Sequence, residues 1–227
     1  MTVMTGAKHE EDSRTAVCGV GTAAVITAAG LSSRMNGFKQ LLPVQGEPML
    51  RHGVRTFLRA GIREVIVVTG FRAADCREAL RDLPVRFVHN PEYASTQMFE
   101  SACLGLRAAL DRGAQAVFVC PADVPLFREE TIHALLAGDG PVRIPSKNGR
   151  GGHPVLMERA AASRLLTDSG EGGMKGAIRR AGLPVTYIPV TDEGAFHDAD
   201  TRGDYDEMLR TAADCSGSGK AGKEPAT

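Results

Sequence analysis

The clearest chemical signal lies in the loop that follows a short apolar run ending at Ala28. Residues 28–33 read Ala-Ala-Gly-Leu-Ser-Ser, and two cations, Arg34 and Lys39, come after them. Small residues let a backbone approach a ligand closely, so that peptide N–H groups can point at its oxygens. With the two cations, this pattern favours a polyphosphate ligand. The candidate nucleotide-binding residues of this loop are Ala28, Ala29, Gly30, Leu31, Ser32, Ser33, Arg34 and Lys39.

The alternative for this loop is an ordinary connection with two solvated cations. A P-loop would require a Gly-x-x-x-x-Gly-Lys-Ser/Thr spacing, but Gly37 is followed by Phe38. A dinucleotide-type fingerprint, residues 19–24, precedes the apolar run instead of following it, so it lacks the context that such a fingerprint needs. The loop therefore has the chemistry of a phosphate site without either common spacing.

An acidic residue follows a second apolar run, in the segment Pro121-Ala-Asp-Val-Pro125. Asp123 would be costly to desolvate unless a cation or hydrogen-bond donors partner it, and the flanking prolines stiffen its position. A hard carboxylate at a strand end suits Mg²⁺, which takes few protein oxygens when phosphates supply the rest. Asp123 is therefore a candidate metal ligand and, with Arg34 and Lys39, a candidate catalytic residue. The alternative is a cap for the helix that begins near Glu129.

Two more carboxylates, Asp198 and Asp200, are candidates for the same metal. They alternate along the chain, so in an extended segment they would share one face. The alternative is that Asp200 or Thr201 caps a helix starting near Asp204. The sequence leaves both interpretations open.

Two glycine-rich segments carry candidate groups for a second substrate. Residues 148–155 contain Arg150 and His153, and residues 169–176 contain Lys175 close to the start of a helix. These three side chains are the candidate acceptor-binding residues. A hairpin or a surface loop with nothing to bind is the alternative for each segment.

A polar segment, residues 90–101, lies between an expected strand and an expected helix. Gln97 and Ser101 are candidate nucleotide-binding residues because they could hydrogen-bond a base or a ribose. A helix cap formed by Ser95 or Thr96 would explain the same segment without a ligand.

Apolar runs of β type alternate with helical patterns through most of the chain, and this alternation positions the candidate residues. It predicts a three-layer α/β domain with a mostly parallel, mixed sheet, whose ligands bind at the carboxyl ends of the strands. The expected strands are residues 23–28, 64–69, 85–89, 116–120, 142–145, 154–157 and 185–190. The expected helices are residues 49–60, 73–81, 98–111, 129–137, 160–166, 174–181 and 204–213.

Composition sets the limits on what this domain can be. The 227 residues include 27 Lys+Arg and 27 Asp+Glu, and this balance argues against bulk binding of nucleic acid or an anionic membrane. No apolar run approaches the ~20 residues of a membrane span, and residues 1–14 lack a signal core, so we expect a cytoplasmic protein. The five scattered cysteines are expected to be free thiols. We expect a leader over 1–20, a single domain over 21–213 and a flexible tail over 214–227.

Taken together, these segments resemble nucleotidyltransferases of the molybdenum cofactor cytidylyltransferase type, which are related to the molybdopterin-guanine dinucleotide enzymes. The resemblance covers residues 25–209. Its motifs are Thr-Ala-Ala-Gly-Leu-Ser-Ser-Arg-Met (27–35), Lys-Gln-Leu-Leu-Pro (39–43), Pro-Ala-Asp-Val-Pro-Leu (121–126), Gly-His-Pro-Val (152–155), Gly-Glu-Gly-Gly-Met-Lys (170–175) and Asp-Ala-Asp-Thr (198–201).

The resemblance implies a Rossmann-like nucleotidyltransferase fold and a Mg²⁺-dependent reaction between a nucleoside triphosphate and a phosphate-bearing acceptor that releases pyrophosphate. It implies that the first loop holds the triphosphate, that Asp123 binds the metal, and that Asp198 and Asp200 lie at the same site. The Ala-Ala-Gly form of the loop is similar to that of CTP users. Molybdopterin is then the implied acceptor, and a molybdoenzyme or its chaperone an implied partner.

Departures from the family pattern fall where the base and the acceptor would be recognised. Where the family usually has Arg-Met-Gly and Ser-Gly-Met, the chain has Arg-Met-Asn-Gly at 34–37 and Ser-Thr-Gln-Met at 95–98. Where the family usually has Gly-Asp-x-Gly-x-Arg and Asp-Thr-Pro-Glu-Asp, the chain has Gly-Glu-Gly-Gly-Met-Lys at 170–175 and Asp-Thr-Arg-Gly-Asp at 200–204. The reaction type therefore transfers more safely than the substrate. The alternatives are nucleotidyl transfer from GTP or another nucleotide to a sugar or other small phosphate, and a non-catalytic module that delivers a nucleotide or cofactor.

Overall fold

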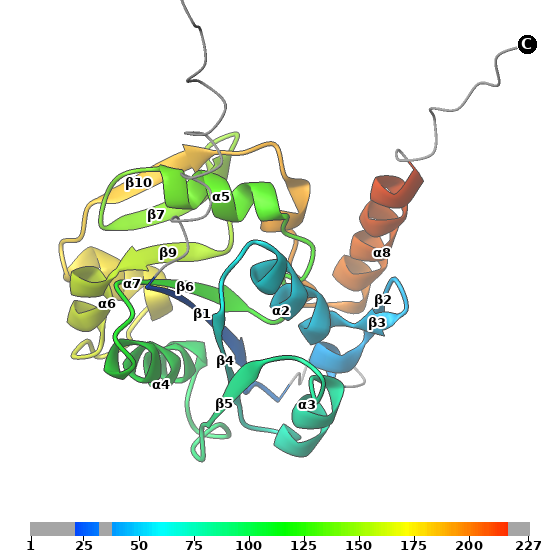
Figure 1. The fold of residues 1–227 in the computed structure, drawn as a ribbon, viewed down its shortest axis with the longest axis horizontal. Helices are drawn as coiled ribbons and strands as arrows, with labels where there is room; N and C mark the ends of the chain where they lie inside the picture. Colours follow the sequence, from blue (N-terminus) through cyan, green and yellow to red (C-terminus); the bar gives the residue numbers. More distant parts are fainter. Residues whose placement is uncertain (1–20, 32–37, 218–227) are drawn as a thin grey trace, which may run out of the picture.

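A central sheet flanked by helices on both faces forms the body of the molecule (Figure 1). The computed structural model describes residues 21–31 and 38–217, so the expected leader and residues 218–227 of the expected tail lie outside the described residues. Within the described ranges, no helix is long and apolar enough to cross a bilayer.

The strands of the main sheet follow the apolar runs of the sequence. They are β1 (Thr22–Ala28), β4 (Glu64–Thr69), β5 (Val85–His89), β6 (Ala116–Pro121), β7 (Val142–Lys147), β8 (Arg150–Gly151), β9 (Val155–Glu158) and β10 (Val185–Pro189). A separate small hairpin consists of β2 (Pro43–Val44) and β3 (Glu47–Pro48).

The helices alternate with these strands. They are α2 (Met49–Arg59), α3 (Ala73–Ala79), α4 (Met98–Asp111), α5 (Glu129–Ala137), α6 (Arg159–Leu165), α7 (Gly173–Arg180) and α8 (Arg202–Gly217), with short 3₁₀ turns η1 (Lys39–Leu41) and η2 (Glu193–Phe196). All the expected strands and helices are present. The structure differs in that α8 continues past residue 213 to Gly217, and in that β8 and the β2–β3 hairpin were not foreseen, since two-residue strands are too short to show periodicity.

The order of strands in the main sheet is β10-β7-β9-β6-β1-β4-β5, with β8 paired to β7. Pairings are parallel except for those of β8 and β9, which confirms the expected mixed, mostly parallel sheet. The chain goes from β1 to β4 and β5 on one side, then returns to β6 on the other side of β1. Such a switch point leaves a crevice at the carboxyl ends of the two central strands. Thr27 of β1 pairs there with Pro121 of β6.

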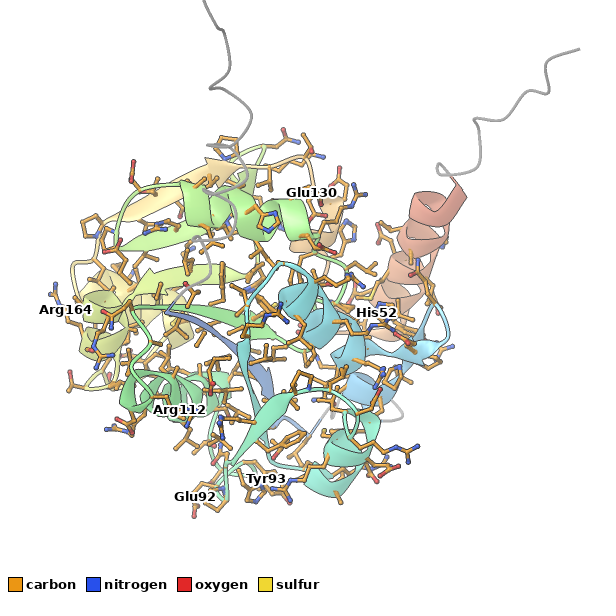
Figure 2. All side chains as sticks on the ribbon, in the orientation of Figure 1. His52, Glu92, Tyr93, Arg112, Glu130 and Arg164 are labelled. Atoms are coloured by element: carbon orange, nitrogen blue, oxygen red, sulfur yellow. The ribbon has the colours of Figure 1, made fainter. Side chains whose placement is uncertain are left out.

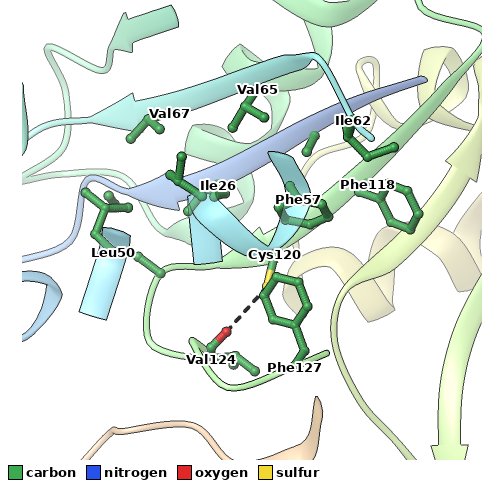
Figure 3. Close-up of a cluster of buried hydrophobic side chains, with 14 of the residues drawn as sticks. Ile26, Leu50, Phe57, Ile62, Val65, Val67, Phe118, Cys120, Val124 and Phe127 are labelled. Carbon is green, nitrogen blue, oxygen red and sulfur yellow. Dashed lines mark hydrogen bonds between the residues drawn. The ribbon is translucent and has the colours of Figure 1, made fainter. Parts of the chain in front are cut away.

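Each face of the sheet has its own apolar core. Ile26 of β1 packs with Leu50 and Phe57 of α2 and with Phe127 (Figure 3). The alternate side chains of β1, such as Val25, pack against α4, α6 and α7 on the opposite face. Strand periodicity thus assigns odd and even residues of β1 to different layers.

Burial also explains why the described cysteine thiols are unreactive. Cys76, Cys103 and Cys120 are free, as expected, whereas the side chains of the other two cysteines lie outside the described residues. Burial raises the pKa of Cys76 to about 12 and that of Cys103 to about 11. These thiols are therefore protonated and weakly nucleophilic at neutral pH.

Helix α4 lies very close to the sheet because it carries a glycine at the contact. A Cβ atom on Gly105 would lie 2.3 Å from Val25 Cγ1 and 2.9 Å from Val68 Cγ2. Both valines are fully buried in a core without room to yield. The small residue therefore fixes the distance between α4 and the carboxyl ends of β1 and β4.

Gly105→Ala is expected to destabilise the domain by about 1–3 kcal/mol, because overpacking outweighs the better helix propensity of alanine. The matched control is Gly53→Ala in α2, where the added Cβ would meet Ile26 and Phe127 at 3.8 Å, an ordinary contact. That variant should gain about 0.5–1 kcal/mol. Urea unfolding measures both, and equal effects of the two substitutions would contradict the close approach of α4.

Candidate active site

A cavity of about 470 Å³ opens at the switch point between β1 and β6. It brings together seven of the candidate residues from distant parts of the chain, namely Ala29, Gly30, Lys39, Gln97, Ser101, Asp123 and Asp200. The lining also includes residues that were not among the candidate site residues, which are Thr27, Gln40, Tyr93, Thr96, Met98, Pro121 and Ala122.

Asp123 is held in the cavity by a tight turn after β6. The Val124 N–H donates to Pro121 O at 3.3 Å, and the Cys120 thiol lies 3.8 Å from Val124 O beneath the turn (Figure 3). The Ala122 N–H donates to Thr27 O at 3.0 Å, so the turn is also tied to β1. These bonds leave the Asp123 side chain buried, with only 6% of the residue exposed.

Asp123 does not cap the following helix. The N–H of Arg128, at the start of α5, donates instead to Asp192 Oδ2 at 2.7 Å, and the Thr131 hydroxyl donates to the same oxygen. Asp192 comes from the loop before η2, so sequence spacing could not have identified it as the cap. Asp123 is thereby left available for the cavity.

Lys39 is the cation that partners Asp123. Its Nζ lies 2.6 Å from Asp123 Oδ2 and 2.9 Å from Asp200 Oδ1. Burial alone would lower the pKa of Lys39, but the two carboxylates outweigh it and the pKa is raised above its usual value. The ammonium therefore stays charged at neutral pH, and it pairs with two carboxylates that lie far apart in the sequence.

The two late carboxylates are placed differently. Asp200 lines the cavity beside Lys39, whereas Asp198 is exposed and does not line it. The capping alternative holds for Thr201, whose Oγ1 accepts from the Asp204 N–H at 3.2 Å while the Asp204 carboxylate accepts from the Thr201 N–H at 2.7 Å. This pair caps α8 and leaves Asp200 facing Lys39.

The donor set fits a magnesium ion better than a soft metal. Asp123 Oδ1 is buried and has no hydrogen-bond partner within the described ranges, and such an orphaned oxygen calls for a cation or a donor. Across those ranges, no three Asp, Glu, His or Cys side chains gather into a closed metal site. One or two carboxylates, with the remaining ligands from phosphates and water, is the arrangement that Mg²⁺ prefers. Asp123 and Asp200 are the carboxylates that could hold it.

The polar segment before α4 forms the opposite wall of the cavity. The buried amide of Asn90 donates to Thr96 Oγ1 at 2.9 Å and to Ser101 Oγ at 3.0 Å. Neither Ser95 nor Thr96 caps the helix, because the cap position is Gln97, whose N–H donates to Glu100 at 3.0 Å. Gln97 and Ser101 thus line the cavity, as do Met98 and, on the loop after β5 in Figure 2, Tyr93.

The candidate acceptor residues do not line this cavity. Arg150 is exposed on β8, which forms a tight hairpin with β7, and Lys175 is exposed on α7. His153 is partly buried, and its Nδ1 has no hydrogen-bond partner among the described residues. Burial lowers the pKa of His153, although the nearby carboxylates of Asp123 and Asp198 oppose this. His153 is therefore close enough to Asp123 for the charge of the Asp123 carboxylate to act on its pKa.

The rest of the first loop divides into three parts. Ala28 is buried in the core and Leu31 is half-exposed, and neither lines the cavity. Ser32, Ser33 and Arg34 lie outside the described residues. Among the described residues of this loop, Lys39 is therefore the cation that faces the candidate site.

Comparison with known proteins agrees with this geometry. Residues 24–185 match the model of the MobA-like NTP transferase domain. The chain is 28% identical over 162 residues to the molybdenum cofactor cytidylyltransferase of Escherichia coli (strain K12), covering 68% of this chain and 79% of that protein. It is 37% identical over 135 residues to the bifunctional protein GlmU of Halorhodospira halophila, covering 57% of this chain but only 28% of that longer protein.

A nucleotidyl transferase from Methanothermobacter thermautotroptrophicus is among the similar solved structures. It superposes with a TM-score of 0.73 at 27% identity, covering 84% of this chain and 98% of the other. The chain belongs to the MobA-like NTP transferase family, and it is a nucleotidyltransferase with a Rossmann-like fold.

Replacing Lys39 tests the ion pairs of the site. Lys39→Met removes the described ion pair of the buried Asp123 carboxylate, so we expect a loss of about 2–3 kcal/mol of stability at pH 7. Most of this loss should come from Asp123, because the Asp200 side chain is 45% exposed and solvent screens it. The measurement is urea unfolding.

The matched control is Lys147→Met, which removes an ion pair to Glu193 between two more exposed side chains. It should change stability by less than about 0.5 kcal/mol. In a double-mutant cycle, Asp123→Asn should recover part of the loss in Lys39→Met. Additive effects of these two substitutions would show that Lys39 and Asp123 are not coupled.

Proposed function

We propose that this protein is a Mg²⁺-dependent cytidylyltransferase that transfers CMP from CTP to the phosphate of a molybdopterin-type cofactor and releases pyrophosphate. The observation that carries the proposal is the combination of Lys39, Asp123 and Asp200 in one cavity at the switch point. The similarity to a molybdenum cofactor cytidylyltransferase supports the choice of CTP and of the acceptor.

In the proposed reaction, an oxygen of the acceptor phosphate attacks the α-phosphorus of CTP. A new P–O bond forms as the bond between the α-phosphorus and the bridging oxygen breaks, and the electron pair leaves with pyrophosphate. The acceptor phosphate is already ionised at neutral pH, so no general base is needed. Catalysis then rests on positioning and on neutralising charge.

The residues of the first loop are proposed to hold the triphosphate. Lys39, with Arg34, would neutralise the β- and γ-phosphates and the charge that grows on pyrophosphate, while Ser32, Ser33 and the backbone around Gly30 would donate hydrogen bonds. Asp123, with Asp200 or Asp198, would hold Mg²⁺. The bound ion supplies Lewis-acid stabilisation of the α-phosphate and of the leaving group.

The remaining assignments complete the proposal. Gln97 and Ser101 would bind the nucleoside, and Arg150, His153 and Lys175 would face the acceptor from outside the cavity. A cytoplasmic location and delivery of the product to a molybdoenzyme or its chaperone are proposed with the activity.

A second acceptor class deserves a direct test because the chain is 37% identical to part of a GlmU protein. Transfer to a sugar phosphate, with CTP or another nucleotide, would use the same cavity and the same release of pyrophosphate. A non-catalytic delivery module is disfavoured, because a binder has less need of a buried carboxylate such as Asp123.

The test of the proposed function is release of pyrophosphate, followed by ³¹P NMR with each nucleoside triphosphate, Mg²⁺ and a panel of acceptors that includes molybdopterin and sugar phosphates. We expect turnover with CTP and molybdopterin, and we expect Asp123→Asn to lower it by about a thousandfold or more, since the metal carboxylate is lost. Asp82→Asn, a surface carboxylate paired with Arg51, is the control and should keep full activity. Absence of pyrophosphate with every pair would favour the delivery module.

A further inference from the structure

Thr27 carries a buried hydroxyl that the fold leaves without a partner. The residue is only 7% exposed, and its Oγ1 is buried with no hydrogen-bond partner within the described ranges. A buried hydroxyl without a hydrogen bond costs about 1–3 kcal/mol, so such a group needs an explanation. Thr27 also lines the cavity at the switch point, and a bound ligand could therefore supply the missing partner.

The position of Thr27 in the sheet indicates which part of a ligand it would meet. Val25 packs against the α4 layer, and the two-residue period of a strand puts Thr27 on the same face of β1. Ser101, in the first turn of α4, lines the same cavity. Since the Asn90 amide donates to Ser101 Oγ, the Ser101 hydroxyl can donate its own proton elsewhere.

The charged groups enter the cavity from the other layer. Lys39 belongs to η1, and the neighbouring Phe38 packs into the core that includes α2. Asp200 follows Ala199, which packs with Met49 at the start of α2. The α2 side of the cavity therefore carries the ions, whereas the α4 side offers the uncharged polar groups of Thr27, Gln97 and Ser101.

We propose that the Thr27 hydroxyl hydrogen-bonds the nucleoside part of the donor nucleotide and helps to hold it on the α4 side of the cavity. This inference rests on the proposed nucleotide binding, and it adds a residue that lies before the first loop and carries no charge. A hydroxyl can both donate and accept, so it suits a ribose hydroxyl or a polar edge of the base. The triphosphate oxygens would instead meet Lys39 of the opposite layer.

The substitution Thr27→Val tests the proposal cleanly, because valine keeps the shape and removes only the hydroxyl. Isothermal titration calorimetry with Mg²⁺ present would compare CTP, GTP and inorganic pyrophosphate as ligands. We expect Thr27→Val to weaken binding of the preferred nucleotide about tenfold and to leave pyrophosphate binding unchanged. Thr27→Ser, which retains the hydroxyl, should stay within about threefold of the wild type.

The melting temperature of Thr27→Val shows whether the Thr27 hydroxyl bonds a ligand or another group of the protein. If the hydroxyl has no partner in the free protein, Thr27→Val should melt at the same temperature as the wild type or higher, because it removes an unsatisfied buried group. A clear fall in melting temperature would mean that the hydroxyl is bonded within the protein, and this would overturn the proposal. Unchanged nucleotide affinity, or an equal loss of pyrophosphate affinity, would also overturn it.

These binding measurements do not depend on turnover. A wild type that binds CTP or GTP but releases no pyrophosphate with any acceptor would refute the proposed transfer reaction and leave the role of Thr27 standing. If the wild type transfers CMP but Thr27→Val binds CTP normally, the transfer reaction would stand and the role of Thr27 would be refuted. A wild type that binds no nucleotide would refute both.

Discussion

The candidate site depends on one electrostatic constraint, which is that a buried carboxylate needs a positive charge beside it. Asp123 is almost fully buried, and the ammonium group of Lys39 provides that charge while also bridging to Asp200. A divalent ion bound by these carboxylates would share them with Lys39. Phosphate oxygens arriving with the ion would offset the repulsion between the two cations.

The sheet makes this arrangement possible by bringing three distant segments to one edge. The switch point puts the ends of β1 and β6 side by side, with the turn of Asp123 tied to Thr27 and the N–H of Ala199 donating to Asp123 O at 3.0 Å. On the other face, the absence of a side chain at Gly105 lets α4 approach the strands closely. The cavity is therefore bounded by two layers of different chemistry, one ionic and one uncharged.

Much of this could be predicted from the sequence because the signals were local. Continuous apolar runs and helical periods located the strands and helices, and Asp123 stood out because an acidic residue directly follows an apolar run. Asp192 was missed as the cap of α5, since the residue that it caps lies 64 positions away. Thr27 was missed because a threonine at the end of a strand looks ordinary until its hydroxyl is found without a partner.

The order of apolar and polar residues determined the elements, the mixed α/β class and the residue types available for phosphate and metal chemistry, because the side chains of a helix or strand repeat their direction every few positions. Only the tertiary structure decided between the alternatives that remained. It put Asp200 beside Lys39 and left Asp198 exposed, gave the cap of α8 to Thr201, and placed Arg150 and Lys175 away from the cavity. These outcomes follow from contacts between distant segments, which are set by the order of strands in the sheet and by the packing of its two faces.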